Sequence, residues 1–180
     1  AGDMGIGNTS SAAAILCALS GAAPANAVGR GTGIDVSALT KKIAAIETAL
    51  ALNHPDAKDP LDVLAKVGGL EIGAIAGVIL GAAAYRMPMV LDGFIAGAAA
   101  LVAQRFSPHV RDFLFASHLS AEKGHRLMLE GLALAPVLDL QMRLGEGTGA
   151  CLLMSLMEAA ARIMGEMATF ESAGVKGKIS

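Results

Sequence analysis

The sequence predicts an α/β fold in which a mostly parallel sheet lies between helices on both of its faces, in three layers. Segments with helical periodicity alternate along the chain with short apolar segments that are typical of buried strands. The chain is 54% hydrophobic but only 3% aromatic, and alanine, glycine and leucine dominate it. Small side chains let helices pack closely on a parallel sheet. These features together are typical of Rossmann-like domains.

The helical segments are recognised by apolar residues three or four positions apart, by capping residues and by glycine or proline at their ends. They are expected at residues 9–20, 37–52, 60–67, 71–85, 95–103, 122–132 and 150–170. Residues 88–93 and 112–117 are predicted to be short buried strands, and 136–140 fits either a strand or the first turn of a helix. No repeat or linker interrupts the chain, so we expect one domain over residues 1–180, ending in the long helix at 150–170.

Composition excludes several classes of protein. There are 14 basic and 16 acidic residues and no basic stripe, which argues against a nucleic-acid surface. The most apolar segment, residues 72–85, is shorter than the roughly 18 residues that a membrane span needs. Cys17 and Cys151 lie far apart in apolar stretches, which predicts two buried free thiols in a reducing, cytoplasmic compartment. The four histidines show no metal-ligand spacing, so no metal is expected.

Two glycine-rich loops could bind an anion. Gly5, Gly7 and Asn8 precede a predicted helix, where backbone N–H groups favour a negatively charged group. The alternative is a tight turn, because this pattern is neither a Walker loop nor a complete dinucleotide motif. Gly31 and Gly33 belong to the second loop, and Lys42 follows on a helix. Lys42 could supply a charge to a phosphate, or it could belong to a solvated helix face.

A glutamate among glycines is the most informative feature. Glu146 stands in the stretch Leu-Gly-Glu-Gly-Thr-Gly, directly before an apolar helix. An acid at this place can simply complement the helix dipole. The functional alternative is a carboxylate that acts as a general base in a cleft, with its protonation tuned by burial.

Six blocks carry a family resemblance when they are taken in order. They are DMGIGNTSSAAA, GRGTGID, DPLDVLAKVGGLEIGAIAG, PMVLDGFIAGAAAL, SHLSAEKGH and LGEGTGA. From about residue 3 to residue 170, the chain resembles the C-terminal half of nicotinate-nucleotide–dimethylbenzimidazole phosphoribosyltransferases. The resemblance implies that the N-terminal half of the enzyme is missing from this sequence.

The resemblance also implies a reaction. Enzymes of this family transfer phosphoribose from nicotinate mononucleotide to 5,6-dimethylbenzimidazole, in the synthesis of the lower ligand of cobalamin. The products are α-ribazole 5′-phosphate and nicotinate. The family implies a homodimer and no cofactor. Two alternatives remain: a non-catalytic nucleotide-binding or scaffold module, and a dinucleotide-dependent oxidoreductase, which is weakened because its characteristic acid is absent.

Roles for individual residues follow from the resemblance alone. Glu146 would take the benzimidazole proton as the catalytic base. Asp3, where the family usually has glutamate, would contact the nicotinate–ribose region. Asp92 would either touch a ribose hydroxyl or order the neighbouring loop. The remaining substrate-binding residues would be those of the glycine loops and the expected phosphate end, namely Gly5, Gly7, Asn8, Gly31, Gly33, Lys42 and Ser120.

Overall fold

The structure is a computed structural model that describes residues 1–31 and 33–175 of the 180-residue chain. Thr32 of the second glycine loop and residues 176–180 of the expected domain lie outside the described residues.

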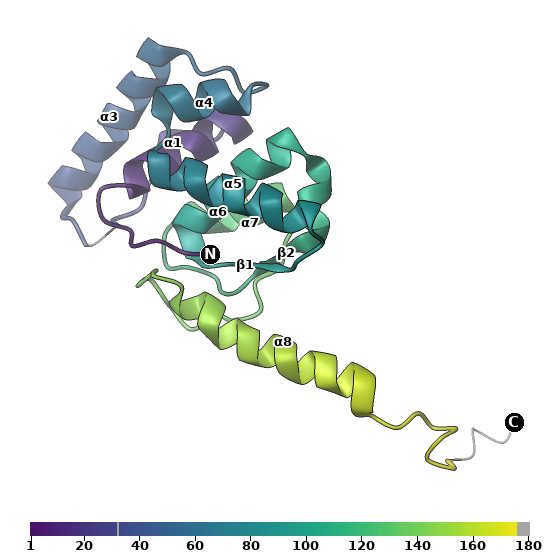
Figure 1. Cartoon of the computed structure of the whole chain (residues 1–180). Helices are drawn as coiled ribbons and strands as arrows, with labels where there is room; N and C mark the ends of the chain where they lie inside the picture. The colour runs from purple at the N-terminus through teal and green to yellow at the C-terminus, as the bar shows by residue number, and fades with distance from the viewer. Residues whose placement is uncertain (32, 176–180) are drawn as a thin grey trace, which may run out of the picture.

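An alanine-rich helix, α6 (Gly93–Phe106), occupies the centre of the body (Figure 1). Every residue from Gly93 to Ala103 is buried, and a helix that is apolar on all sides is typical of a core position. Helices α1 (Thr9–Ser20), α5 (Leu70–Ala84) and α7 (His125–Leu132) pack directly against it. Its alanines and glycines allow these close approaches.

The remaining helices complete the body or extend from it. They are α2 (Pro24–Ala27), α3 (Val36–Asn53), α4 (Pro60–Val67), the 3₁₀ helix η1 (Pro108–Phe113) and α8 (Thr148–Glu166). All seven predicted helices are therefore present, with ends that differ by a few residues. The short α2 and η1 were not predicted, because each has too few residues to show a periodic pattern.

The predicted parallel sheet is present and small. Strand β1 (Met89–Leu91) pairs in parallel with β2 (Leu114–Ala116), with Met89 opposite Leu114. Leu91 belongs to the core of the helical body, whereas Val90 packs against Leu153 of α8. Because successive side chains of a strand point to opposite faces, the helical body covers one face of the sheet and α8 the other (Figure 1). The α/β class is confirmed, in a chain that is mostly helical.

The segment at 136–140 forms neither a helix nor a full strand, but it pairs at one residue with the segment that follows β2. Leu138 forms a parallel bridge with His118, and its amide donates to the Ser117 carbonyl over 2.9 Å. This single bridge places Leu138 beside the residues that follow β2. The chain that follows it is thereby directed to the same edge of the sheet as the loops after β1 and β2.

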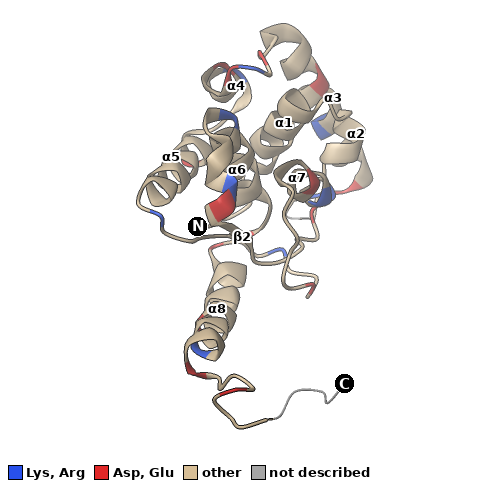
Figure 2. Cartoon of the chain, turned by 90° about the vertical axis from the view of Figure 1, so that its right-hand side faces the viewer, with Lys and Arg blue, Asp and Glu red and all other residues tan. Residues whose placement is uncertain are grey.

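Helix α8 differs at both ends from the predicted range of 150–170. It begins at Thr148 and ends at Glu166. Beyond its end, the Ser172 amide donates to Thr169 Oγ1 over 3.1 Å, and such side-chain bonds to the backbone compete with helix formation. The helix projects from the body with few neighbours, as Figures 1 and 2 both show.

One expectation about the cysteines is wrong. Cys17 is buried in α1, where burial raises the pKa of its thiol to about 11. Cys151, in the first turn of α8, is free as well but exposed. In the part of the chain that the structure describes, no helix is both long and apolar enough to cross a bilayer.

Candidate active site

Loops from the carboxyl ends of the strands meet around one cavity of about 530 Å³. Asp92 and Gly93 follow β1, and His118 and Ser120 follow β2. The segment after Leu138 contributes residues 143–146 to the wall. The first loop joins them because the Ala1 carbonyl accepts the Asp92 amide over 2.9 Å, at the end of β1. Ligands of parallel α/β folds bind at this edge of the sheet.

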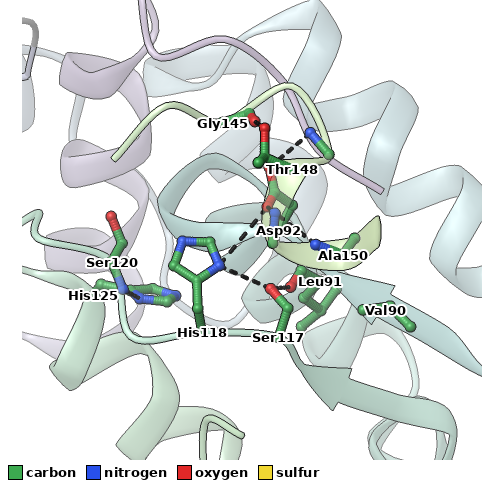
Figure 3. Close-up of polar contacts among 12 residues, drawn as sticks. Val90, Leu91, Asp92, Ser117, His118, Ser120, His125, Gly145, Thr148 and Ala150 are labelled. Carbon is green, nitrogen blue, oxygen red and sulfur yellow. Dashed lines mark hydrogen bonds and ion pairs between the residues drawn. The ribbon is translucent and has the colours of Figure 1, made fainter. Parts of the chain in front are cut away.

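Asp92 holds the start of α8 in place. Its side chain is buried and leaves its own helix, α6, without a side-chain cap. Oδ2 instead accepts the Gly147 amide over 2.8 Å, and Oδ1 accepts the amides of Gly149 and Ala150 over 2.8 and 3.4 Å. These are otherwise unpaired N–H groups at a helix N-terminus. Asp92 thus orders the loop that carries Glu146, which is one of the two roles considered for it (Figure 3).

Glu146 stands in a strained, exposed turn at the cavity. Its φ of 59° is left-handed, between Gly145 at 82° and Gly147 at 84°. A left-handed residue other than glycine costs about 1–2 kcal/mol. The turn is closed by Thr148, whose hydroxyl and amide both donate to the Gly145 carbonyl. Strain of this kind is typical of functional sites, and here it presents a carboxylate at the cavity wall.

The first loop packs against the Glu146 turn. A Cβ on Gly145 would collide with the carbonyl oxygen of Asp3, so only glycine fits between the two loops. Asn8 Nδ2 donates to Asp3 Oδ2 and to the Met4 carbonyl, both over 2.9 Å. Asn8 therefore fixes the shape of the first loop from behind, and Asp3 lines the cavity.

A charged cluster forms the other end of the cavity. Lys42 Nζ donates to Thr9 Oγ1 over 2.7 Å and to the Gly29 carbonyl over 3.4 Å. An ammonium has three donors, so one is left for a ligand next to Thr9 and Gly31, which line the cavity. Burial lowers the pKa of Lys42, and the charge of Glu122 opposes this shift.

Glu122 belongs to this cluster and was not among the predicted residues. A Cβ on Gly29 would collide with its Oε2 atom, so that glycine makes room for the carboxylate. Burial raises the pKa of Glu122, against the opposing effects of Lys42, the Gly31 amide and Arg143. Arg143, which also lines the cavity, was missed as well. The block SHLSAEKGH contains Glu122, but only the tertiary structure places it beside Lys42.

Two histidines support the loop that follows β2. His118 is buried, lines the cavity and lies 2.9 Å from Ser117 Oγ. His125 Nδ1 accepts the Ser120 amide over 2.9 Å and so positions Ser120. Burial lowers the pKa of both rings, for His125 to about 4. The spacing of the histidines in the sequence did not predict a role for either residue.

The cavity gathers most of the predicted site residues but not all of them. Those in its wall are Asp3, Gly5, Gly31, Asp92, Ser120 and Glu146. Asn8 and Lys42 contact the wall residues from behind. Gly7 and Gly33 lie outside the wall and serve turns, with φ of 81° and 107°. Among the described residues, no cluster of three or more His, Cys, Asp or Glu suits a metal ion.

Comparison with known proteins gives the family. Residues 1–175 match the model of a family described as "Phosphoribosyltransferase". The chain belongs to this family.

Named relatives agree with this assignment. The chain is 62% identical over 174 residues to the nicotinate-nucleotide–dimethylbenzimidazole phosphoribosyltransferase of Geobacter sulfurreducens, covering 97% of the chain and 49% of the relative. It is 58% identical to the corresponding enzyme of Roseiflexus sp., covering 99% of the chain and 50% of the relative. The crystal structure of CobT from Thermus thermophilus superposes with a TM-score of 0.93 at 54% identity, covering 98% of the chain and 53% of that structure. The chain therefore spans about half the length of the relatives that it matches.

The role of Asp92 can be tested by substitution. In Asp92→Asn, an NH₂ group replaces one of the two carboxylate oxygens. The backbone amides that donate to this oxygen in the wild type then face another donor and lose their hydrogen-bond partner. We expect a loss of about 1–3 kcal/mol in the free energy of unfolding and faster amide exchange at Gly147 and Gly149. Asp112→Asn makes the same chemical change at an exposed position and should leave both unchanged. If Gly147 and Gly149 exchange their amide protons at equal rates in the two variants, Asp92 does not cap the N-terminus of α8.

The buried histidines predict a pH dependence of stability. The pKa of His125 falls from 6.5 in the unfolded chain to about 4 in the fold, so between these values the unfolded state binds more protons. The free energy of unfolding should therefore fall as the pH drops from 6.5 to 4, by up to about 3 kcal/mol. Denaturant titrations at several pH values measure this. His125→Asn, which keeps an acceptor for the Ser120 amide, should flatten the slope, whereas the exposed His109→Asn should not.

Proposed function

We propose that residues 1–180 form the C-terminal half of an enzyme that transfers phosphoribose from nicotinate mononucleotide to 5,6-dimethylbenzimidazole. Family membership and the names of the relatives support this proposal. The observation that carries it is the strained Glu146 turn, which Asp92 fixes beside a cavity with cationic groups at its other end.

The proposed mechanism uses the two ends of the cavity for different parts of the substrates. The nucleotide phosphate would lie near Lys42, Gly5, Gly31 and Ser120. Gly7, Gly33 and Asn8 would shape the loops around it, and Asp3 would contact the nicotinate–ribose region. No cofactor is required, because the C1′–N bond of the nucleotide is already activated by the nicotinate leaving group.

Glu146 would act as the general base. It removes the N–H proton of dimethylbenzimidazole while the other ring nitrogen attacks C1′ of the ribose. The bond from C1′ to nicotinate breaks, nicotinate leaves with the electron pair, and the configuration at C1′ inverts. An exposed carboxylate between two glycines leaves space for a planar ring to approach. The product is α-ribazole 5′-phosphate.

The assignment of roles is tested by separating turnover from binding. Glu146→Gln should lower kcat by about 10²–10⁴-fold with little change in affinity for nicotinate mononucleotide. Lys42→Ala should instead weaken nucleotide binding by about 1–3 kcal/mol, the range for charge-assisted contacts. Steady-state kinetics and calorimetry would measure both. They need a protein of the family's length, such as a fusion of this chain to the N-terminal half of the Geobacter sulfurreducens relative.

Asp3 is the matched control for the base, since it is an acid of the cavity wall whose loop packs against the Glu146 turn. Asp3→Asn should cost less turnover than Glu146→Gln. Normal turnover in Glu146→Gln together with an inactive Asp3→Asn would move the base to the first loop. If the wild-type fusion binds the nucleotide but forms no α-ribazole 5′-phosphate, the non-catalytic alternative would hold.

We also propose that the protein is a homodimer and that it acts in the cytoplasm. Helix α8 presents Leu152, Leu156 and Ile163 on one stripe, each about half exposed, and exposed apolar stripes favour association. The two free thiols agree with a reducing compartment.

The dimer proposal is tested by sedimentation. Ile163→Glu, on the apolar stripe, should shift the protein toward monomer, because it places a charge in the interface. Ala161→Glu puts the same side chain on the opposite, exposed face of α8 and should leave the assembly unchanged. A dimer that survives Ile163→Glu would place the interface elsewhere.

A further inference from the structure

The hydrogen bonds at His118 fix which of its ring nitrogens carries the proton. Ser117 Oγ lies 2.6 Å from the Leu91 carbonyl oxygen, and a carbonyl can only accept. The hydroxyl proton therefore lies in that bond. Ser117 Oγ also lies 2.9 Å from His118 Nδ1, so Nδ1 must be the donor. Asp92 Oδ1, 3.8 Å from the same nitrogen (Figure 3), favours a proton there.

The other ring nitrogen is left as an acceptor. Burial lowers the pKa of His118, with Asp92 opposing this effect, so the ring is neutral at neutral pH. A neutral imidazole with the proton on Nδ1 carries a free lone pair on Nε2. Within residues 1–31 and 33–175, Nε2 has no hydrogen-bond partner, although the side chain is only 2% exposed. Among the described residues, the fully enclosed side-chain atoms that lack a partner are Asn8 Oδ1 and Glu122 Oε2. Nε2 of His118 is not one of them, so it keeps some access from the cavity and is free to accept a hydrogen bond there.

The free nitrogen faces the cavity. His118 belongs to its wall, and Gly93, another wall residue, keeps the space beside Nε2 open. A Cβ on Gly93, whose φ is 68°, would lie 3.3 Å from Nε2. The opposite side of the ring is closed, because Gly149 at the start of α8 packs against Nδ1. The ring therefore has one orientation and one open polar atom.

His118 also lies between the two ends of the cavity. On one side is Ser120, whose Cβ is 3.7 Å from the same hypothetical Gly93 Cβ, and beyond it the Lys42 and Glu122 cluster. On the other side, Asp92 and Gly149 connect the ring to the Glu146 turn. In a nucleoside monophosphate the sugar lies between the phosphate and the base.

We infer that Nε2 of His118 accepts a hydrogen bond from a ribose hydroxyl of the nucleotide and so positions the sugar between the phosphate end and Glu146. This inference rests on the proposed function, which supplies the nucleotide. A hydroxyl is the suitable ligand because it donates one hydrogen bond and carries no charge to bury.

His118→Asn separates this role from a structural one. The Asn amide can still donate to Ser117 from about the position of Nδ1, but it has no atom at Nε2. We expect nicotinate mononucleotide to bind this variant about 3- to 10-fold more weakly, the value of one neutral hydrogen bond. His118→Gln, which can place its amide oxygen near the former Nε2, should recover part of the affinity. His109→Asn is the matched control, because His109 is exposed and does not belong to the cavity wall.

The decisive measurement is calorimetry with the 2′-deoxy and 3′-deoxy analogues on the fusion described above. One analogue should bind the wild type and His109→Asn more weakly than the parent nucleotide does. In His118→Asn that difference should disappear, because the acceptor for the missing hydroxyl is already gone. Penalties for both analogues that persist unchanged in His118→Asn would overturn the inference.

A second measurement keeps the inference testable if His118→Asn does not fold. In ¹⁵N spectra of wild-type protein labelled at histidine, the unprotonated Nε2 resonance of His118 should shift when nicotinate mononucleotide binds. It should shift less with the analogue that lacks the contacting hydroxyl, and equal shifts with all three ligands would exclude the contact. A wild-type fusion that binds no nicotinate mononucleotide would instead overturn the proposed function, and this inference with it.

Discussion

The carboxylate of Asp92, buried at the end of β1, is the constraint on which the cavity depends. It accepts amides from Gly147, Gly149 and Ala150 and so joins the sheet to the start of α8. Without it, the first turn of a helix with few other neighbours would leave its N–H groups unpaired inside the protein. The same carboxylate faces His118. The turn with Glu146 and the orientation of His118 are therefore set by one side chain.

Small residues make this arrangement possible. Gly149 lies so close to Asp92 and His118 that no side chain would fit there, and Gly145 has the same relation to the Asp3 carbonyl. In the body, the buried alanines of α6 let α1, α5 and α7 approach closely. Such packing has little tolerance for added volume. The unusual content of alanine and glycine thus serves both the core and the cavity wall.

The cavity holds opposite charges at one end although the chain is nearly neutral. Lys42 and Arg143 lie near Glu122, whose burial favours the protonated form. An anion at this end of the cavity would lie near cationic donors and near the carboxyl group of Glu122, whose pKa is raised by burial. The acid at the far end, Glu146, is exposed instead, and the two carboxyl groups have different environments within one cavity.

The local sequence pattern determined most of the helices and both strands of this protein. The proline at its start and the glycines after its end predicted α4 to the residue, and short apolar segments predicted β1 and β2. These features depend on neighbours along the chain. The ordered glycine blocks also indicated the family and pointed to Glu146 and Lys42. The tertiary structure decided what depends on distant residues. It put Glu122 beside Lys42, exposed Cys151, turned Asp92 toward α8 and left Nε2 of His118 facing the cavity. Contacts between residues so far apart in the chain arise only when the strands pair and the helices pack, so no local pattern could contain them.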